Sequence, residues 1–307
     1  MKTHSLYPLM FRPQYRDYLW GGDLIATRYN RANTPRPCAE SWELCGLPGH
    51  ESVVANGPFE GVGLGHLTQT FGRDLVGAKA PDPERFPLLV KILDVHSRLS
   101  VQVHPDAKAA ASLGGEPKHE MWYLLDAAPN ATLWAGLRPD ADLANLAEPD
   151  LVAHRTHTGD VFDVPAGLVH CIGPGNLLYE VQQPSDTTLR VHDWGRGRPT
   201  QPEAARVAIH PGLRATCLPQ PAAKRDLCPR LSTPDFSFAT LSLTHGRTLH
   251  TTEQSLMVLF CAEGKTTLEH DGPHPLTLLP GDSVLIPARQ TVFLHPFAPT
   301  KLLVTTL

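Results

Sequence analysis

The chain has 307 residues, of which 41% are hydrophobic and 19% charged, so it can bury a sizeable core and is not disordered by composition. Its 27 lysines and arginines against 31 aspartates and glutamates give a net charge of −4, which argues against a general electrostatic attraction to nucleic acid or to a membrane. We find neither an apolar run of membrane-helix length nor the apolar core of a secretory signal. The six cysteines form no CxxC pair, which favours reduced thiols, and we expect a cytoplasmic protein.

Short apolar runs between glycines and prolines predict many strands and few helices. Helices are predicted at residues 63–77, 106–114, 141–155 and 203–210. Strands are predicted at 86–95 and 97–105, in a hairpin of 120–127 and 131–137, and through 159–196. Residues 211–233 are rich in proline and show no periodicity, which is typical of a linker or a wrapping segment. From Phe236 to Leu307 the pattern is strands throughout.

A short motif occurs twice in the chain. Gly159-Asp160 is followed after four residues by Pro165-Ala166, and the same spacing returns at residues 281–288. His170 lies five residues beyond the first proline, whereas Val292 holds the equivalent place in the second copy. The repeat favours two related β-barrels, of which the second has lost an imidazole.

Four polar residues are candidates for a metal site in the first barrel. Gln102 and His104 lie two residues apart on an alternating strand, so their side chains share a face. If Glu120 and His170 also point into the barrel, two imidazoles, a carboxylate and an amide oxygen form a plausible set for Zn²⁺. Alternatively, each is an ordinary polar residue, since a lone histidine is more often simply hydrogen-bonded and Glu120 could face solvent. The spacing alone leaves both interpretations open.

The first copy of this repeated motif also carries a recognisable signature. Residues 159–170, GDVFDVPAGLVH, match the second cupin motif, G-x5-P-x-G-x2-H. Four segments, ESWELCG, LLVKILDVHSRLSVQVHPD, PKHEMWYLL and residues 159–196, occur in the order found in type I mannose-6-phosphate isomerases. The chain therefore resembles the short bacterial form of that family over nearly its whole length.

The resemblance implies a mainly β fold of two cupin (jelly-roll or β-barrel) domains. We expect a metal-binding catalytic domain over residues 1–210 with a small helical insertion near 63–115, a linker at 211–233, and a metal-free cupin-like domain at 234–307. It also implies one Zn²⁺ per chain, held by Gln102, His104, Glu120 and His170, and a small phosphosugar as partner.

The implied reaction interconverts mannose 6-phosphate and fructose 6-phosphate by proton transfer through an enediolate. Arg190 and Lys118 are expected in the active site, and strand alternation places Lys118 on the face of Glu120 and Ser100 on the face of Gln102. We therefore expect Arg190 and Lys118 to be catalytic, and Ser100, Lys118 and Arg190 to bind substrate.

The sequence does not identify the general base, and two other functions remain open. Candidates for the base are a metal-bound water, His192, Asp193 or another carboxylate such as Glu43, although packing is the favoured explanation of Glu43. A bicupin can also serve as a sugar sensor without catalysis. Two histidines and a carboxylate suit non-haem iron as well, as in a cupin oxygenase, but Gln102 and the two basic residues favour a phosphosugar.

Overall fold

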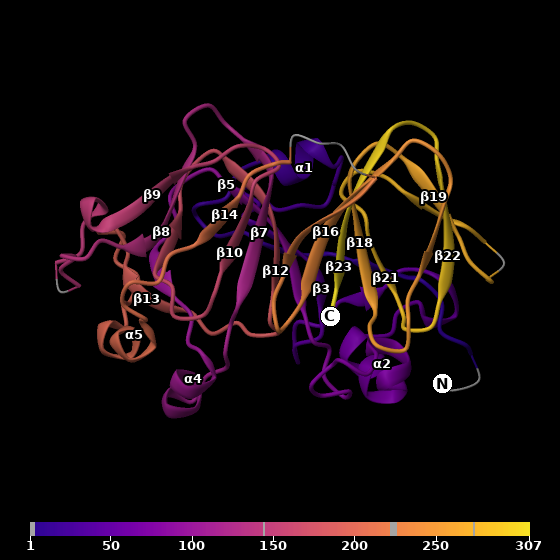
Figure 1. Ribbon diagram of the computed structural model, residues 1–307, viewed down its shortest axis with the longest axis horizontal. Helices are drawn as coiled ribbons and strands as arrows, with labels where there is room; N and C mark the ends of the chain where they lie inside the picture. The colour runs from indigo at the N-terminus through magenta and orange to yellow at the C-terminus, as the bar shows by residue number, and fades with distance from the viewer. Residues whose placement is uncertain (1–3, 144, 222–225, 273) are drawn as a thin grey trace. The chain divides into compact units, whose positions relative to one another are not determined.

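The computed structural model describes residues 4–143, 145–221, 226–272 and 274–307 (Figure 1). As predicted, strands dominate and the helices are few and short. The residues group into two compact units. Unit 1 consists of residues 1–14, 42–89 and 221–307, and unit 2 of residues 15–41 and 90–220.

Unit 1 is a sandwich of two sheets around an apolar core. Its seven-stranded sheet has the order β15 (Leu227–Ser232), β16 (Ser237–Leu243), β23 (Thr300–Thr306), β18 (Met257–Glu263), β21 (Ser283–Ile286), β1 (Leu9–Arg12), β4 (Val53–Val54). Its four-stranded sheet has the order β17 (Arg247–His250), β22 (Thr291–Pro296), β19 (Thr266–Glu269), β20 (Leu276–Leu278). Inward-facing residues of both sheets, such as Leu259 and Leu294, form one buried cluster.

Unit 2 supplies most of a second pair of sheets. The seven-stranded sheet has the order β14 (Thr216–Leu218), β10 (Val161–Val164), β7 (Glu120–Ala127), β12 (Asn176–Gln182), β5 (Leu89–Val95), β3 (Glu40–Cys45), β2 (Gln14–Arg16). The five-stranded sheet has the order β13 (Leu189–His192), β6 (Val101–Val103), β11 (His170–Ile172), β8 (Thr132–Leu137), β9 (Leu151–Arg155). Trp122 and Ile172, one from each sheet, belong to the same buried cluster.

The helices are α1 (Leu24–Arg28), α2 (Leu64–Phe71), α3 (Arg73–Val76), α4 (Ala107–Leu113) and α5 (Pro202–Ala208), with 3₁₀ turns at η1 (Gly57–Phe59) and η2 (Glu148–Asp150). The helix predicted over 63–77 is split into α2 and α3 because Gly72 takes a φ of +52°. None of the helices in the described part of the chain is long and apolar enough to cross a bilayer.

The two copies of the motif form the same turn in their respective units. Gly159 and Gly281 have φ values of +91° and +95°, a region that glycine enters without strain. The following aspartate accepts a backbone N–H with its side chain in each copy, from His157 at 2.9 Å and from Leu279 at 2.8 Å. The predicted internal repeat is therefore visible at the level of hydrogen bonds.

Two sequence predictions, a hairpin and a helix, need correction. Residues 120–127 and 132–137 are strands, but β7 and β8 lie in different sheets and do not form the predicted hairpin. Residues 148–155 form η2 and β9 in place of a helix, and after the buried Leu151 the side chains of β9 alternate between half-buried and exposed as in a strand. The stretch 211–233 contributes β14 and β15, although its residues 222–225 lie outside the described chain.

The predicted domain boundaries, at residues 1–210, 211–233 and 234–307, stay a prediction. The two observed units are not consecutive segments of the chain, because residues 42–89 group with the C-terminal strands.

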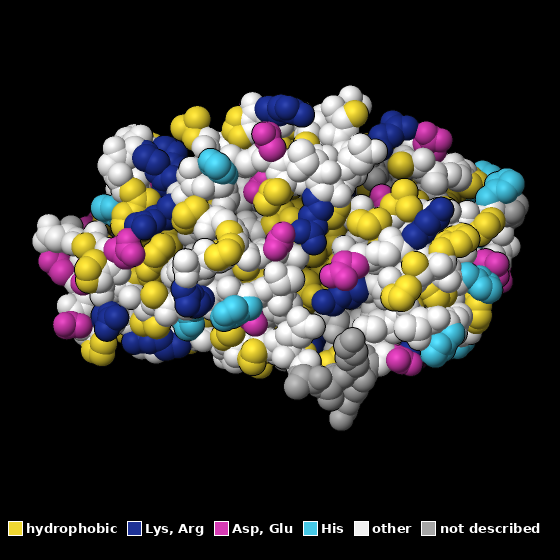
Figure 2. Space-filling model, turned by 90° about the horizontal axis from the view of Figure 1, so that it is seen from above, with side chains coloured by type: hydrophobic (Ala, Val, Ile, Leu, Met, Phe, Trp, Pro, Cys, Tyr) yellow, Lys and Arg dark blue, Asp and Glu magenta, His cyan; other side chains and the backbone are white. Residues whose placement is uncertain are grey.

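On the face shown in Figure 2, positive and negative side chains are interspersed, in line with the small net charge.

Candidate metal centre and cavity

Neighbouring strands bring three of the predicted site residues into one row of unit 2. His170 on β11 is the register partner of Gln102 on β6, and Gln102 is in turn the partner of Arg190 on β13. His104 follows β6 directly, and Glu120 is the first residue of β7. Residues far apart in the sequence thus meet because their strands are neighbours.

The side chains of His104, Glu120 and His170 converge. One ligand atom from each lies within 4.8 Å of the others. His104 Nε2 is 3.4 Å from Glu120 Oε2, and His170 Nε2 is 3.3 Å from Glu120 Oε1. All three residues are buried, with at most 2% of their surface exposed.

Backbone carbonyls orient both imidazole rings. His104 Nδ1 lies 2.9 Å from the carbonyl oxygen of Thr187, and His170 Nδ1 lies 2.9 Å from that of Leu168. A carbonyl can only accept, so each Nδ1 carries the proton and each Nε2 presents a lone pair to Glu120. This is the arrangement in which histidines bind metal ions.

The burial and charge of these groups fit a divalent cation. Within the described chain, His104 Nε2 and both carboxylate oxygens of Glu120 make no hydrogen bond, although they are buried. Lys118 Nζ, 3.0 Å from Glu120 Oε2, contributes only an ion pair. Buried polar atoms without hydrogen bonds are costly, and a metal ion would satisfy all three.

The protonation states of the two histidines and of Glu120 also favour metal binding. Burial, aided by the Lys118 ammonium, lowers the pKa of His104 to about 3, and burial also lowers the pKa of His170. Burial raises the pKa of Glu120, but the Lys118 ammonium opposes this, and the pKa lies well below its ordinary value. Two neutral imidazoles and a carboxylate are the forms that metal binding requires.

Gln102 lies beside this group. Its Nε2 is 3.2 Å from His170 Nε2. The two ends of an amide are exchanged by a half-turn of the side chain, which would bring Oε1 toward the position of a fourth ligand. Gln102 also lines the adjoining cavity.

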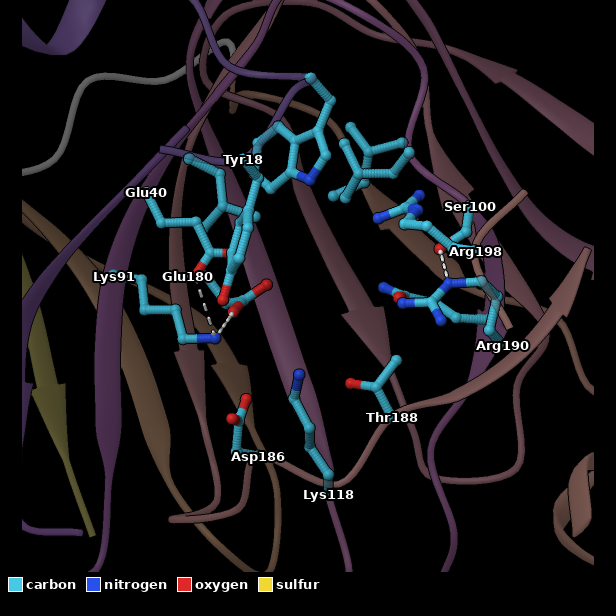
Figure 3. A pocket seen from close by; sticks show the side chains of 15 residues that line it. Tyr18, Glu40, Lys91, Ser100, Lys118, Glu180, Asp186, Thr188, Arg190 and Arg198 are labelled. Carbon is cyan, nitrogen blue, oxygen red and sulfur yellow. Dashed lines mark hydrogen bonds and ion pairs between the residues drawn. The ribbon is translucent and has the colours of Figure 1, made fainter. Parts of the chain in front are cut away.

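A cavity of about 260 Å³, entirely within unit 2, adjoins this group through Gln102 and Lys118, which line it, whereas His104, Glu120 and His170 are not among its lining residues (Figure 3). Arg190, Arg198 and Ser100 stand on one side of the view, with Thr188 below them. Tyr18 and the ion pairs of Lys91 stand on the other, and Lys118 rises between the two sides. The cavity therefore has a cationic wall and a wall where charges are paired.

All three predicted substrate-binding residues line this cavity. Arg190 Nε donates to Ser100 Oγ at 3.4 Å, and its NH1 group donates to the carbonyl oxygen of Pro199 at 2.8 Å. Burial and the neighbouring Arg198 lower the pKa of Arg190 below its ordinary value. Lys118 is 5% exposed, so its charge is largely shielded from water.

The paired wall, which is formed by Lys91 and the carboxylates of Glu40 and Glu180, was overlooked in the sequence analysis. Lys91 on β5 lies 3.3 Å from Glu180 and 3.7 Å from Glu40, and all three are buried. Trp122 Nε1 donates to the other oxygen of Glu180 at 2.9 Å. A single lysine in the apolar run FPLLVKILDV, and a single glutamate in NLLYEVQ, were the available signals, because such residues are seldom buried without partners.

None of the three side chains proposed as general base is among the cavity-lining residues that the structure describes. Asp193 is held by Arg198 and Arg196, whose hydrogen bonds outweigh the effect of burial and lower its pKa, so it is a poor base. His192 packs against Trp194 in a T-shaped arrangement, with the ring centroids 4.8 Å apart. Glu43 belongs to unit 1, where Ser283 donates to it.

Models of two protein families match this chain. Residues 9–131 match the catalytic domain of type I phosphomannose isomerase, and residues 230–294 match the cupin domain of mannose-6-phosphate isomerase. The predicted fold class, mainly β with two cupin domains, is thereby confirmed.

Two curated proteins are similar to part of the chain. It is 38% identical over 198 residues to mannose-6-phosphate isomerase ManA of Bacillus subtilis, and 36% identical over 197 residues to the mannose-6-phosphate isomerase of Streptococcus mutans. Each match covers 62% of this chain, and they span 62% and 61% of the respective relatives.

Solved structures resemble the whole chain. The crystal structure of the Bacillus subtilis mannose 6-phosphate isomerase superposes with a TM-score of 0.86 at 25% identity, covering 98% of this chain and 100% of that one. A zinc-bound mannose 6-phosphate isomerase superposes with a TM-score of 0.77 at 19% identity, which shows a shared fold. That comparison covers 98% of this chain and 99% of the other.

Proposed function

This chain belongs to the type I phosphomannose isomerase family, and we propose that it is a zinc-dependent isomerase that interconverts mannose 6-phosphate and fructose 6-phosphate. The observation that carries the proposal is the position of the His104, Glu120 and His170 cluster beside a cavity with a cationic wall. The relatives named for this reaction support the choice of substrate.

We assign the metal ligands to His104, Glu120, His170 and Gln102. Zn²⁺ bound there would supply positive charge that polarises the carbonyl and hydroxyl oxygens of an open-chain sugar. Lys118 holds Glu120 in its charged form, and the carbonyls of Thr187 and Leu168 hold the rings of the two histidines. These groups keep the ligand atoms oriented before any ion arrives.

The cationic wall is suited to the phosphate group of the substrate. The guanidinium of Arg190 offers a planar fork of donors, and Ser100 Oγ lies next to it. Lys118 extends into the cavity between this wall and the opposite one, where its ammonium can stabilise negative charge on the reacting oxygens (Figure 3). We therefore propose substrate binding by Ser100, Lys118 and Arg190, and catalytic roles for Lys118 and Arg190.

The reaction needs a base that takes the proton from C2 of the aldose and returns it to C1, while a second proton moves from O2 to O1. Three carboxylates line the cavity, those of Glu40, Glu180 and Asp186. Burial raises the pKa of Glu180, although Lys91 opposes the rise, and a raised pKa brings a carboxylate closer to the range that a general base needs. We propose that the base comes from this group.

The test is a coupled assay with a panel of phosphorylated aldoses and ketoses, together with measurement of bound metal. We expect the His104→Ala variant to lose most of its zinc and more than about 99% of its activity, because outright removal of a ligand exceeds the roughly 10- to 100-fold loss typical of altering its supporting hydrogen bonds. His157→Ala removes a histidine that is 70% exposed in the same unit, and should change neither quantity.

Three outcomes of this test would count against the proposal. Full activity of His104→Ala without bound metal would refute the metal role. A wild-type protein that binds phosphosugars without turnover would favour a sugar sensor. Oxygen uptake by an iron-loaded protein that leaves the phosphosugars unchanged would favour an oxygenase.

A further inference from the structure

Arg198 is a second guanidinium group in the cationic wall. It lines the cavity beside Arg190 and Ser100, and Figure 3 shows the three side chains together. Two neighbouring cations repel each other, and the charge of Arg198 contributes to the lowered pKa of Arg190. Something must therefore hold Arg198 in place against this repulsion.

The carboxylate of Asp193 supplies that hold. It accepts from Arg198 NH2 at 2.6 Å and from Arg198 Nε at 3.0 Å, and it also accepts the backbone N–H of Arg198 at 3.1 Å. Arg196 NH2 donates to the same carboxylate at 2.9 Å. Asp193 is 5% exposed, whereas the side chains of Arg198 and Arg196 are 34% and 30% exposed, so the carboxylate end of these charge-assisted bonds is shielded from solvent.

The turn that carries these residues is fixed to the segment bearing Ser100. Trp194 has a φ of +55°, an uncommon value for a bulky residue that persists where the surroundings enforce it. Its Nε1 donates to the carbonyl oxygen of Leu99 at 2.7 Å, and Arg196 donates to that of Arg98 at 2.5 Å. The guanidinium of Arg98 lies over the Trp194 ring, 4.5 Å from its centroid.

We propose that Asp193 is a positioning residue, which holds the Arg198 guanidinium in the cavity wall so that Arg190 and Arg198 together bind the phosphate group of the substrate. The proposal rests on the proposed function for the identity of the substrate. Asp193 itself does not line the cavity, so it acts through Arg198.

The sign of the effect separates positioning from simple electrostatics. Asp193 is negative, so if it acted only through its charge, its neutralisation would strengthen the binding of a phosphate dianion. If it positions Arg198, its neutralisation releases a guanidinium and weakens binding. Asp193→Asn keeps the size of the side chain and therefore gives opposite results under the two hypotheses.

The experiment compares KM for mannose 6-phosphate, kcat, and inhibition by inorganic phosphate. We expect Asp193→Asn to raise KM and the inhibition constant of phosphate about tenfold, with kcat changed less than about threefold, because one charge-assisted contact is weakened. Arg198→Ala should raise both constants at least as much. In the Arg198→Ala background, Asp193→Asn should add less than about twofold, because its effect passes through Arg198.

Two variants complete the design. Glu203→Gln breaks an exposed ion pair with Arg206 in the same unit, and should leave all constants unchanged. Arg198→Lys keeps the charge but loses the fork of donors, so it should raise KM and the inhibition constant of phosphate as Asp193→Asn does. It tests the role of the guanidinium independently if Asp193→Asn folds poorly. A lowered or unchanged KM in Asp193→Asn, or fully additive effects in the double variant, would overturn the proposal.

Failure of the proposed function would be recognised separately. If the wild-type protein does not isomerise mannose 6-phosphate, the same variants are compared by calorimetric titration with inorganic phosphate. Weaker phosphate binding in Asp193→Asn would then support the positioning role, and unchanged or tighter binding would overturn it.

Discussion

Lys91 is a buried cation whose surroundings decide its charge. Burial lowers its pKa, but the carboxylates of Glu40 and Glu180 raise it further, so the net shift is upward and the ammonium stays charged at neutral pH. Glu180 in turn has a raised pKa, because burial exceeds the attraction of Lys91. The paired wall of the cavity therefore depends on one lysine between two carboxylates.

Removal of this lysine should be costly. We expect Lys91→Met to lower the free energy of unfolding by about 3–5 kcal/mol, because it leaves two buried carboxylates without their cation. Urea unfolding at pH 7 measures the change. Lys108→Met, on the exposed face of α4, is the control and should stay within about 0.5 kcal/mol of the wild type.

The pH dependence of this variant follows from the same pair. Without Lys91, the folded-state pKa of Glu180 rises further above its unfolded value, so between these two values the folded state binds more protons than the unfolded chain. Stability then increases as pH falls. The deficit of Lys91→Met should accordingly shrink between pH 7 and pH 5, and adding Glu180→Gln should recover part of it; a constant deficit would contradict this account.

At the scale of elements, the two units share a strand register but differ in the residues at equivalent positions, which explains why unit 2 alone holds a candidate metal centre in the described part of the chain. Glu120 pairs with Val164 in unit 2, and Met257 pairs with Ile286 in the equivalent place of unit 1. Likewise Gln102 pairs with His170, as Leu249 does with Val292. The positions equivalent to Gln102, His104, Glu120 and His170 are thus Leu249, Thr251, Met257 and Val292. Apolar side chains at three of them pack into the core of unit 1.

The repeated turn should matter equally to both units. In each copy an aspartate side chain accepts a backbone N–H and closes the turn that feeds β10 or β21. We expect Asp160→Ala and Asp282→Ala each to lower the free energy of unfolding by about 1–2 kcal/mol, as for loss of a capping carboxylate. Urea titration of each variant is the measurement. Asp140→Ala, at an exposed position after β8, should have almost no effect, and equal losses in all three would disprove a specific role of the turn.

Local patterns in the sequence predict the secondary-structure elements better than they predict which strands pair. The Asp106 side chain that accepts from the N–H of Ala109, together with Gly114 in a left-handed conformation, bounds α4 close to its predicted limits. The predicted hairpin failed because alternation defines β7 and β8 as strands but does not say which sheet each joins. The candidate ligands could be named from the sequence because strand alternation puts Gln102 and His104 on one face, the cupin motif marks His170, and the family resemblance implies the full set with Glu120. Lys91 and Glu180 were missed because their pairing depends on the order of β5 and β12 in a sheet.

At the scale of the whole molecule, each unit has an apolar core of its own, whereas the candidate metal ligands found among the described residues all lie in unit 2. The cluster around Leu259 lies in unit 1, and the cluster around Trp122 lies in unit 2. Since His104, Glu120 and His170 all lie in unit 2, a bound ion stabilises that unit directly. We therefore expect metal binding to stabilise unit 2 against local opening and to leave unit 1 unchanged.

Hydrogen exchange measured with and without zinc tests this division. At a free zinc concentration 100 times the dissociation constant, binding contributes about 2.7 kcal/mol, which slows exchange roughly 100-fold for amides that open only when the site is lost. We expect this slowing in peptides from β7 and β11, but not in peptides from β18 and β22, which are their structural counterparts in unit 1. In His104→Ala the effect of zinc on β7 and β11 should disappear. No slowing is expected in unit 1, because the positions equivalent to the ligands there offer no such set. Equal slowing in both pairs of strands would therefore contradict a stabilisation confined to unit 2.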